Sequence, residues 1–349
     1  MKVAAVMRAV ERDGRADQLL VHTGQHYDAA MNDVFFADLG LATPNHYLGI
    51  GGGSHAEQTA KVMMAFEPIL DLEKPDRVVV VGDVNSTLAA TLVAVKRGIP
   101  VAHVEAGLRS FDRSMPEEIN RIVTDSLCDQ LFTHSPEARD HLLREGHTDD
   151  QIFFVGNVMI DALFAHLPQA KARQTLQKLE VSRHGYGVLT LHRPANVDDP
   201  RALDRLLDLI DDVVSYLPLI FPVHPRTAGR LEAAKSEGRK LSPNLRLAPP
   251  LGYLDFVALL DGARMVLTDS GGIQEETTAL GVPCLTLREN TERPVTCQVG
   301  TNVLVGSDRE KLQRELSRVL SEPARAPDLR LPDLWDGHAA DRIVPILLR

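Results

Sequence analysis

The sequence predicts an α/β protein built from two Rossmann-like domains, each a doubly wound parallel sheet, that face each other across a ligand-binding cleft. Three observations predict this fold class. The chain has 349 residues, which is more than one hydrophobic core usually serves. Short β-rich runs alternate along it with longer helical patterns. These β-rich runs are nearly continuous in apolar residues, which is typical of parallel strands covered by helices on both faces.

The first domain is expected to span residues 1–161. Its predicted strands are residues 19–23, 77–81, 101–104, 131–133 and 152–155. Residues 1–12 have a helical pattern, and no strand precedes them. A doubly wound sheet normally begins with a strand at its centre, so the first strand of this domain is missing from the sequence. We expect that strand to be encoded upstream of Met1; the alternative is a chain that has lost both the strand and its activity.

The second domain is expected to span residues 183–330. Its predicted strands are residues 187–191, 219–221, 245–248, 265–268, 284–287 and 302–305. Between the domains, residues 162–182 are polar, helical and free of strand signals, so they are predicted to form a bridging helix. A proline-rich loop near residues 323–332 leads to a last helix in residues 331–349, which is expected to pack back on the first domain.

Composition narrows the functional class. The formal net charge of −10 and the pI near 5.7 argue against a surface for nucleic acid or anionic membrane. Cys128, Cys284 and Cys297 are too far apart for a CxxC metal site, and they are expected to be small core residues in a reducing compartment. No apolar stretch approaches the roughly 20 residues of a membrane span, and there is no signal-peptide pattern, so a cytoplasmic location is expected.

The segment DSGGIQEE at residues 269–276 is the most informative motif. The predicted strand at 265–268 runs directly into Asp269, and a helix follows the two glycines. Unpaired N–H groups and the positive end of the helix dipole would favour a phosphate there. Glu276 would then reach a sugar hydroxyl. The alternative is structural: Ser270 caps the helix and Gly272 allows close packing.

Polar residues follow several other predicted strands. Ligands of doubly wound folds bind at the carboxyl ends of strands, and a single cleft would collect Asp83, Glu105, Arg109, Glu117, His192, Arg193, His224 and Arg226. Each residue also has a structural alternative: Asp83 or Ser86 as a helix cap, Glu117 as a partner of Arg121 one helical turn on, and His224 as a satisfied loop histidine.

Longer motifs carry a family resemblance. They are HVEAGLR at 103–109, MPEEINR at 115–121, GNVMIDAL at 156–163, DSGGIQEE at 269–276 and TERP at 291–294. Together, and in this order, they resemble the non-hydrolysing UDP-N-acetylglucosamine 2-epimerases, from about residue 2 to residue 305. The resemblance implies a glycosyltransferase-B-like fold, reversible interconversion of UDP-GlcNAc and UDP-ManNAc without NAD or an obligatory metal, and a homodimer.

The resemblance also assigns residues by position. Catalytic positions match Asp83, Glu105, Glu117 and His192. The UDP contacts match Lys2, Phe256, Ser270, Gly271, Gly272, Glu276 and Arg293. Phe256 would support the uracil ring, although a core phenylalanine is the structural alternative.

Other functions remain open on the sequence alone. TGQHYD at 23–28 and GIGGGSHAEQT at 49–59 resemble a branch that includes epimerases of UDP-linked diacetamido-uronic acids. Asp28 follows Gln25 where regulated bacterial enzymes carry another glutamine pattern, so allosteric activation by UDP-GlcNAc is not expected. The further alternatives are a glycosyltransferase on the same fold and a catalytically impaired UDP-sugar binder.

Overall fold

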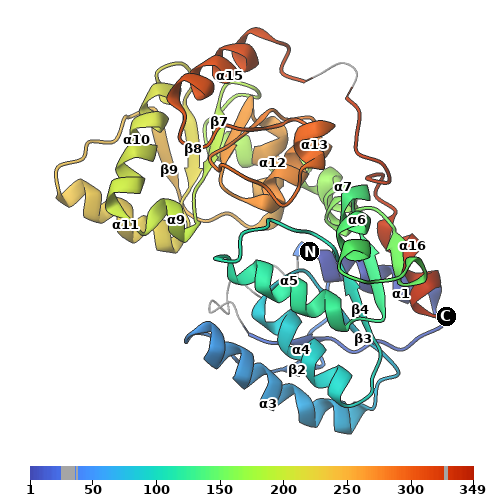
Figure 1. The fold of residues 1–349 in the computed structure, drawn as a ribbon. Helices are drawn as coiled ribbons and strands as arrows, with labels where there is room; N and C mark the ends of the chain where they lie inside the picture. The colour runs from blue at the N-terminus through green and yellow to red at the C-terminus, as the bar shows by residue number, and fades with distance from the viewer. Residues whose placement is uncertain (25–35, 37, 326–328) are drawn as a thin grey trace. The chain divides into compact units, whose positions relative to one another are not determined.

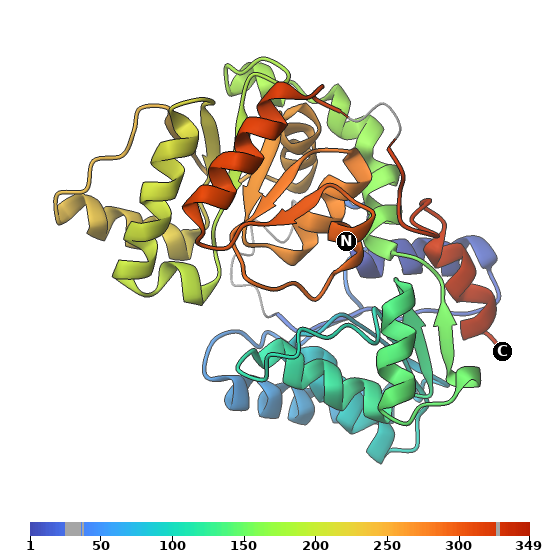
Figure 2. The ribbon, with the colours of Figure 1, turned by 45° about the horizontal axis from the view of Figure 1, so that its top comes forward.

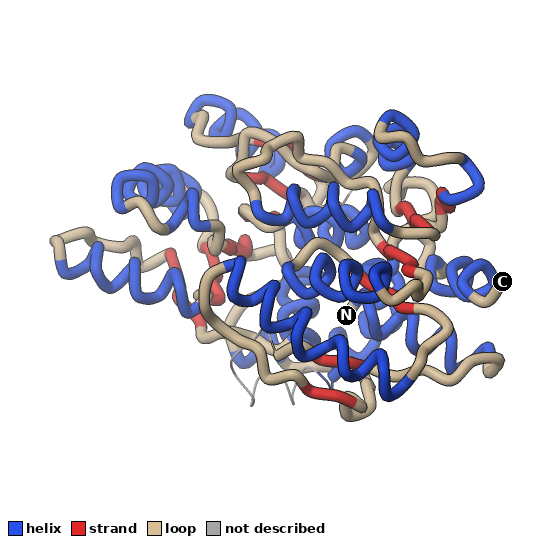
Figure 3. The backbone as a smooth tube through the Cα atoms, turned by 60° about the horizontal axis from the view of Figure 1, so that its bottom comes forward, coloured by secondary structure: helices blue, strands red, loops and turns tan. Residues whose placement is uncertain are grey.

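The chain forms two compact α/β units, and a computed structural model describes residues 1–24, 36, 38–325 and 329–349. Unit 1 comprises residues 1–162 and 333–349, and unit 2 comprises residues 163–332. Helices, blue in Figure 3, surround the strands, red in that figure. The predicted α/β class with parallel sheets is therefore confirmed.

Unit 2 holds a sheet of six parallel strands in the order β12-β11-β10-β7-β8-β9. Counted along the chain from β7, this is the 3-2-1-4-5-6 order of a Rossmann fold, which reverses direction between β7 and β10. The strands are β7 (Gly187–Thr190), β8 (Leu219–Pro222), β9 (Leu245–Ala248), β10 (Met265–Thr268), β11 (Cys284–Thr286) and β12 (Asn302–Leu304).

Helices cover both faces of this sheet. Because successive side chains of a strand point to opposite faces, neighbouring residues of one strand pack against different helices. Leu189 and Leu267 pack with α10 (Pro200–Val214) and α15 (Arg309–Ser321) on one face. Val188 and Val266 pack with α12 (Tyr253–Gly262) and α13 (Gly271–Leu280) on the other (Figure 1). This two-sided burial accounts for the continuous apolar runs in the sequence.

Unit 1 holds a parallel sheet in the order β3-β4-β5-β6 and a separate parallel pair, β1-β2. Within the described residues, no strand pairs with the outer edge of β3. The strands are β1 (Val21–His22), β2 (His46–Tyr47), β3 (Val78–Val81), β4 (Val101–Val104), β5 (Gln130–Thr133) and β6 (Ile152–Phe154).

The C-terminal segment belongs to unit 1. Helix α16 (Ala339–Leu347) lies beside α1 (Lys2–Asp13), and both pack on the face of the sheet that carries Val104 and Phe132 (Figures 1 and 2). The motif GNVMIDAL explains part of this docking. A side chain at Gly156 would collide with the carbonyl of Leu334, since an added Cβ would lie 2.1 Å from that oxygen. Asp161 accepts hydrogen bonds from the first N–H groups of α16 at 3.0 and 2.7 Å.

The opposite face of the unit 1 sheet carries α3, α4 and α6, with residues of each in one apolar cluster. The remaining helices of unit 1 are α3 (His55–Glu73), α4 (Asn85–Lys96), α5 (Pro116–Leu127), α6 (Pro136–Arg144) and the short 3₁₀ helix η1 (Asp149–Gln151). Those of unit 2 are α8 (Thr175–Lys178), α9 (Pro194–Val197), α11 (Pro225–Ser236) and α14 (Val295–Gln298).

Several details differ from the prediction. The predicted bridging helix is two helices, α7 (Val158–Ala172), which starts earlier than expected, and α8. Strand β2 has only two residues and was not predicted. Cys128 and Cys284 are buried as expected, but Cys297 is exposed, because it lies at the end of α14. Gln25 and Asp28 lie outside the described residues. No helix that the structure describes is both long and apolar enough to cross a membrane.

Candidate active site

The loop after β4 places Glu105 in an unusual backbone conformation. Glu105 has a φ of 76°, and Gly107 two residues later has a φ of 78°. The left-handed region is uncommon for a residue with a side chain and costs of order 1–3 kcal/mol unless the surroundings enforce it. Of the described non-glycine residues with a positive φ, Glu105 is the one that is buried, and such strain is common at functional sites.

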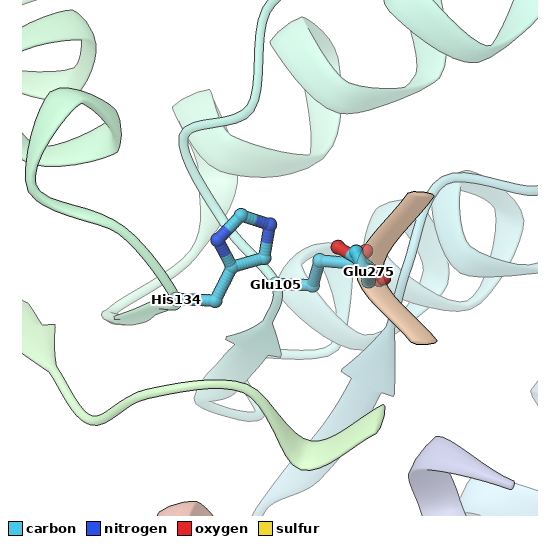
Figure 4. Close-up of side chains that lie close together, drawn as sticks. All are labelled: Glu105, His134 and Glu275. Carbon is cyan, nitrogen blue, oxygen red and sulfur yellow. The ribbon is translucent and has the colours of Figure 1, made fainter. Parts of the chain in front are cut away.

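The carboxylate of Glu105 lies among polar groups at the carboxyl edge of the unit 1 sheet. Its side chain is 6% exposed and forms an ion pair with the ammonium of Lys2. A ring nitrogen of His134, the residue directly after β5, lies within 4.8 Å of a Glu105 carboxylate oxygen. Figure 4 shows the two side chains on neighbouring loops. Two ligands from this unit are too few for a stable metal site, whereas a carboxylate beside an ammonium and an imidazole suits proton transfer.

Helix α5 buries a polar face beneath these loops. Glu118 is 1% exposed and accepts hydrogen bonds from the backbone N–H groups of Ser110 and Phe111 at 2.9 and 2.8 Å. Arg121 donates to Glu118 at 2.8 Å and to Asp83 at 2.5 Å. The helix therefore ties the loop after β4 to the loop after β3 through charged groups that satisfy one another.

A second buried network lies below Glu105. His103 makes contacts of 2.6 Å with Asp125 and 2.8 Å with the carbonyl of Gly82. Asp125 also accepts from the N–H of Gly107 at 3.0 Å and pairs with Arg109 at 2.7 Å. Burial alone would raise the pKa of Asp125, but His103 and Arg109 outweigh it and hold the pKa below its ordinary value.

Arg109 is placed differently from the prediction. It was expected to contact substrate, but its side chain is 1% exposed and pairs with Asp125 and with Glu145. Its guanidinium is therefore committed to the fold of unit 1, since a buried ion pair of this kind is not released without a large penalty.

The other two predicted carboxylates of unit 1 lie near the surface. Asp83 follows β3 and is 24% exposed at its side chain. It is not a helix cap, because α4 begins after Val84 and has no side-chain cap. Glu117 is half-buried in the first turn of α5, where the positive end of the helix dipole favours its negative charge. Both are placed where a solvent-accessible acid or base can act.

In unit 2 the predicted residues meet at the point where the strand order reverses. His192 and Arg193 follow β7, and Asp269 follows its neighbour β10. Asp269 is fully buried and lies 2.9 Å from Nδ1 of His192, whose side chain is 44% exposed. His224, after β8, is exposed and its ring centroid is 6.3 Å from that of His192. Ligands of Rossmann folds bind at this position.

Helix α13 begins with the predicted glycine turn. Its N-cap residue is Ser270, but the Ser270 side chain makes no capping hydrogen bond, so the capping alternative is wrong. A side chain at Gly271 would displace the buried Arg293 guanidinium, because an added Cβ would lie 2.5 Å from it. Without a side-chain cap, the first N–H groups of α13 provide the type of site that binds an anion.

Arg293 belongs to a buried cluster of charges beside this helix. It donates to Glu275 at 2.7 Å and to Glu292 at 2.6 Å. Arg288 donates to Glu292 at 2.8 Å, and Arg193 does so at 3.3 Å. Burial would raise the pKa of Glu292, but the charges of Arg293 and Arg288 hold it well below its ordinary value. Three guanidinium groups against two carboxylates leave this cluster with an excess of positive charge.

Glu276 of α13 is buried, with one carboxylate oxygen unpartnered among the described residues. It is 3% exposed, and its Oε1 atom has no hydrogen-bond partner within the described part of the chain. Burial and the neighbouring charge of Glu275 raise its pKa to about 7, against a smaller opposing effect of Tyr253. Buried polar atoms are nearly always hydrogen-bonded, so an unsatisfied carboxylate beside an anion site indicates a ligand hydroxyl.

Phe256 lies on α12, partly buried against the core cluster that includes Leu259 and Ile273. The core alternative for this residue therefore fits its contacts, while its exposed part remains available to a planar ring.

Several residues of these networks were not among the predicted site residues. They are His103, Glu118, Asp125, His134, Asp269, Glu275 and Glu292. His134 and Asp269 follow predicted strands in the same way as Glu105, so their position was a usable signal. His103, Glu118, Glu275 and Glu292 lie inside the motifs HVEAGLR, MPEEINR, DSGGIQEE and TERP, so their presence in a motif was a usable signal. Asp125 lies outside every motif, and no local pattern distinguishes it.

The sequence and the fold match known proteins. A family model described as UDP-N-acetylglucosamine 2-epimerase matches residues 8–348. UDP-N-acetylglucosamine 2-epimerase of Methanocaldococcus jannaschii is 42% identical over 353 residues, which cover 99% of this chain and 95% of that protein. A crystal structure of the M. jannaschii enzyme in complex with UDP-GlcNAc and UDP superposes with a TM-score of 0.90, covering 99% of this chain and 96% of that one.

A second relative is named for a different substrate. UDP-2,3-diacetamido-2,3-dideoxy-D-glucuronate 2-epimerase of Pseudomonas aeruginosa is 41% identical over 317 residues, which cover 89% of this chain and 86% of that protein. These matches confirm the resemblance seen in the sequence motifs and the predicted glycosyltransferase-B-like fold class. The chain belongs to the UDP-N-acetylglucosamine 2-epimerase family.

Proposed function

We propose that this protein interconverts UDP-GlcNAc and UDP-ManNAc by inverting carbon 2 of the sugar. The observation that carries the proposal is the 42% identity, across 99% of the chain, to the M. jannaschii UDP-N-acetylglucosamine 2-epimerase. The strained, buried Glu105 and the unsatisfied Glu276 support it independently, because they provide a proton-transfer group and a ligand-binding group.

The chemistry proceeds by anti elimination and re-addition. The C1–O bond to UDP breaks, and C1 gains oxocarbenium character that acidifies the neighbouring C2–H. A base takes the C2 proton, its electron pair forms the C1–C2 double bond of a glycal, and UDP leaves as an anion. An acid then returns a proton to the opposite face of C2, and UDP adds back to C1. The two faces require more than one acid/base group.

In unit 1, Asp83, Glu105 and Glu117 supply these acid/base groups. The unusual backbone conformation of Glu105 sets the direction of its side chain. Lys2 holds the carboxylate in an ion pair and also offers a positive charge. Asp83 is oriented by Arg121, and Glu117 lies in the first turn of α5.

In unit 2, the UDP group binds at the start of α13. The N–H groups after Ser270, at Gly271 and Gly272, face the diphosphate, and Arg293 adds positive charge. Glu276 accepts a hydrogen bond from a sugar hydroxyl. His192 stabilises the charge that develops on the leaving diphosphate.

Turnover identifies the reaction. Purified protein and UDP-GlcNAc, with no acceptor and no added cofactor, are followed by ¹H NMR spectroscopy. We expect UDP-ManNAc to form and reach an equilibrium mixture. Release of free ManNAc and UDP would indicate a hydrolysing enzyme, and no change without an acceptor would favour a glycosyltransferase. Calorimetric binding of UDP without turnover would indicate a UDP-sugar binder.

The second candidate substrate is a UDP-linked diacetamido-uronic acid. The 41% identity to the P. aeruginosa enzyme favours it. A uronic acid carries an extra carboxylate, which a cationic group must meet. Comparison of kcat/KM for the two substrates decides between them.

We also propose that the protein acts in the cytoplasm as a homodimer and supplies precursors of cell-surface polysaccharide. The support is the family resemblance of the sequence motifs. Analytical ultracentrifugation at micromolar concentration tests the dimer: a single species near 38.4 kDa would contradict it.

A further inference from the structure

We propose that Asp269 is a positioning residue for His192: it fixes the Nδ1-protonated tautomer and the ring orientation, so that Nε2 is the atom offered to the substrate. The structural part of this inference stands on the contacts of unit 2 alone. Its catalytic consequence rests on the proposed function.

The tautomer follows from the contact between the two side chains. Oδ1 of Asp269 lies 2.9 Å from Nδ1 of His192. An ionised carboxylate only accepts hydrogen bonds, so Nδ1 must carry the proton that joins the pair. In the neutral ring, Nε2 then holds a lone pair; in the protonated ring it donates. The tautomer of a histidine is set in this way by the partner of its other nitrogen.

Asp269 is suited to this role because its own position is fixed. It is fully buried at the end of β10. It accepts hydrogen bonds from the backbone N–H of His192 at 3.1 Å, from that of Arg193 at 2.9 Å and from the side-chain amide of Asn196 at 3.1 Å. Burial would raise the pKa of Asp269, but the interaction with His192 and the other hydrogen bonds hold it below its ordinary value, so the carboxylate stays charged.

The surroundings of His192 leave Nε2 as its functional end. Among the described residues, the charged and titratable groups near this edge of the sheet include Asp269, Arg193, Glu292 and His224. The Arg193 side chain is turned toward the carbonyl of Asp269 and toward Glu292. His224 lies with its ring centroid 6.3 Å away. Since the His192 side chain is 44% exposed, its ring is open to a ligand on the side away from Asp269.

The catalytic consequence concerns the leaving diphosphate. A protonated His192 whose Nδ1 is held by Asp269 donates from Nε2 to a phosphate oxygen, and the buried carboxylate stabilises the imidazolium. If the ring only shares its Nε2 proton with the phosphate, it keeps that proton when UDP adds back. If it has transferred the proton, it takes the proton back at Nε2. Without the carboxylate, the ring rotates or adopts the other tautomer and presents the wrong nitrogen.

A purely structural role is the competing explanation, since Asp269 also holds the loop after β7. Asp269→Asn separates the two. Asparagine keeps an oxygen that accepts from the His192 and Arg193 N–H groups, but it removes the charge, and its amide donates to Nδ1. Asn196→Ala is the matched control, because it removes another hydrogen bond of the same carboxylate and leaves the contact with Nδ1 intact.

The primary test is NMR spectroscopy of protein with ¹⁵N-labelled histidine at alkaline pH without ligand, with His192 assigned by the signals lost in His192→Gln. We expect a protonated Nδ1 and an unprotonated Nε2 in the wild type and in Asn196→Ala, and a shift toward Nε2–H in Asp269→Asn. A wild-type His192 that is protonated at Nε2 overturns the proposal, and so does an unchanged tautomer in Asp269→Asn. The wild-type measurement decides even where the variant does not fold.

Kinetics supply the second readout. We expect Asp269→Asn to lower kcat by at least about tenfold with KM changed less than about threefold, and Asn196→Ala to keep kcat within about threefold of wild type. Undiminished kcat in Asp269→Asn contradicts the proposal. If the wild type does not turn over UDP-GlcNAc, the proposed function fails, while the tautomer measurement still stands.

Discussion

Lys2, the first residue of α1, forms an ion pair with Glu105, the residue directly after β4. The pair joins the helix that opens the chain to the carboxylate that carries the strained backbone. The ion pair holds the Glu105 carboxylate beside a cation.

Replacement of the carboxylates tests the acid/base assignment. Glu105→Gln and Glu117→Gln should each lower kcat by at least about 10²-fold and leave UDP affinity nearly unchanged, because only proton transfer is lost. Steady-state kinetics and calorimetry measure the two quantities. Asp150→Asn, at an exposed carboxylate of η1, is the control and should match the wild type. Wild-type turnover in either glutamine variant would remove that residue from the mechanism.

Glu276 provides a test of UDP binding. Glu276→Ala should weaken UDP binding by about 1–3 kcal/mol, the range expected for a lost hydrogen bond to a charged group. Isothermal titration calorimetry at pH 8 measures the effect, with Glu237→Ala at the exposed end of α11 as the control. Equal affinities of the Glu276→Ala variant and the wild type would assign Glu276 to the fold rather than to the ligand.

The same residue predicts a pH-dependent stability. The pKa of Glu276 is about 7 in the folded protein and near its ordinary value of 4.5 in the unfolded chain. The folded state therefore binds the proton more tightly, and Glu276 destabilises the fold increasingly as pH rises from 4.5 to 7. At pH 8 this destabilisation amounts to about 3 kcal/mol.

Glu276→Gln, which cannot ionise, should remove this dependence. Urea unfolding of ligand-free protein should show little difference between the variant and the wild type at pH 4. At pH 8 the variant should be the more stable. A difference that is constant across this pH range would show that Glu276 does not titrate in the folded protein.

The network below Glu105 predicts a large effect on stability. Asp125→Asn leaves the Arg109 guanidinium and the His103 ring without their shared buried carboxylate. Loss of one partner of a buried ion pair costs about 3–5 kcal/mol. Because the pKa of Asp125 is lowered in the folded state, its contribution is present at neutral pH and is lost as pH falls below its ordinary value of 3.8.

Urea unfolding at pH 7 measures this effect, with Asp129→Asn as a comparison at a carboxylate to which the described residues donate one backbone hydrogen bond, from Val101. We expect Asp125→Asn to lower the free energy of unfolding several-fold more than Asp129→Asn does. Similar losses for the two variants would contradict the role given to the network.

The sequence predicts the sheets better than the networks that support the site. Strands such as β7 and β10 are recognisable because both faces are covered and their apolar runs are unbroken. Glu105 and His192 are recognisable because the carboxyl ends of parallel strands are local features of the chain.

The side-chain partners were not predictable in this way. Arg109 lies 36 residues from Glu145, and Asp269 lies 77 from His192, so only the folded chain brings them together. Helix α5 buries charged Glu118 and Arg121, which a hydrophobic pattern assigns to the surface. Arg109 was placed among the ligand contacts because it follows a predicted strand, and its pairing with Asp125 and Glu145 is visible only in the folded chain.

The most direct test of the proposed reaction is solvent exchange at carbon 2. The wild-type protein is incubated with UDP-GlcNAc in D₂O, and the C2 position of the recovered nucleotide sugars is examined by ¹H NMR spectroscopy and mass spectrometry. We expect deuterium at C2 of UDP-ManNAc, and at C2 of UDP-GlcNAc as the equilibrium is approached. In Glu105→Gln, loss of the C2 hydrogen and gain of deuterium should both be abolished. Formation of UDP-ManNAc that retains its original C2 hydrogen, or no turnover of UDP-GlcNAc, would contradict it.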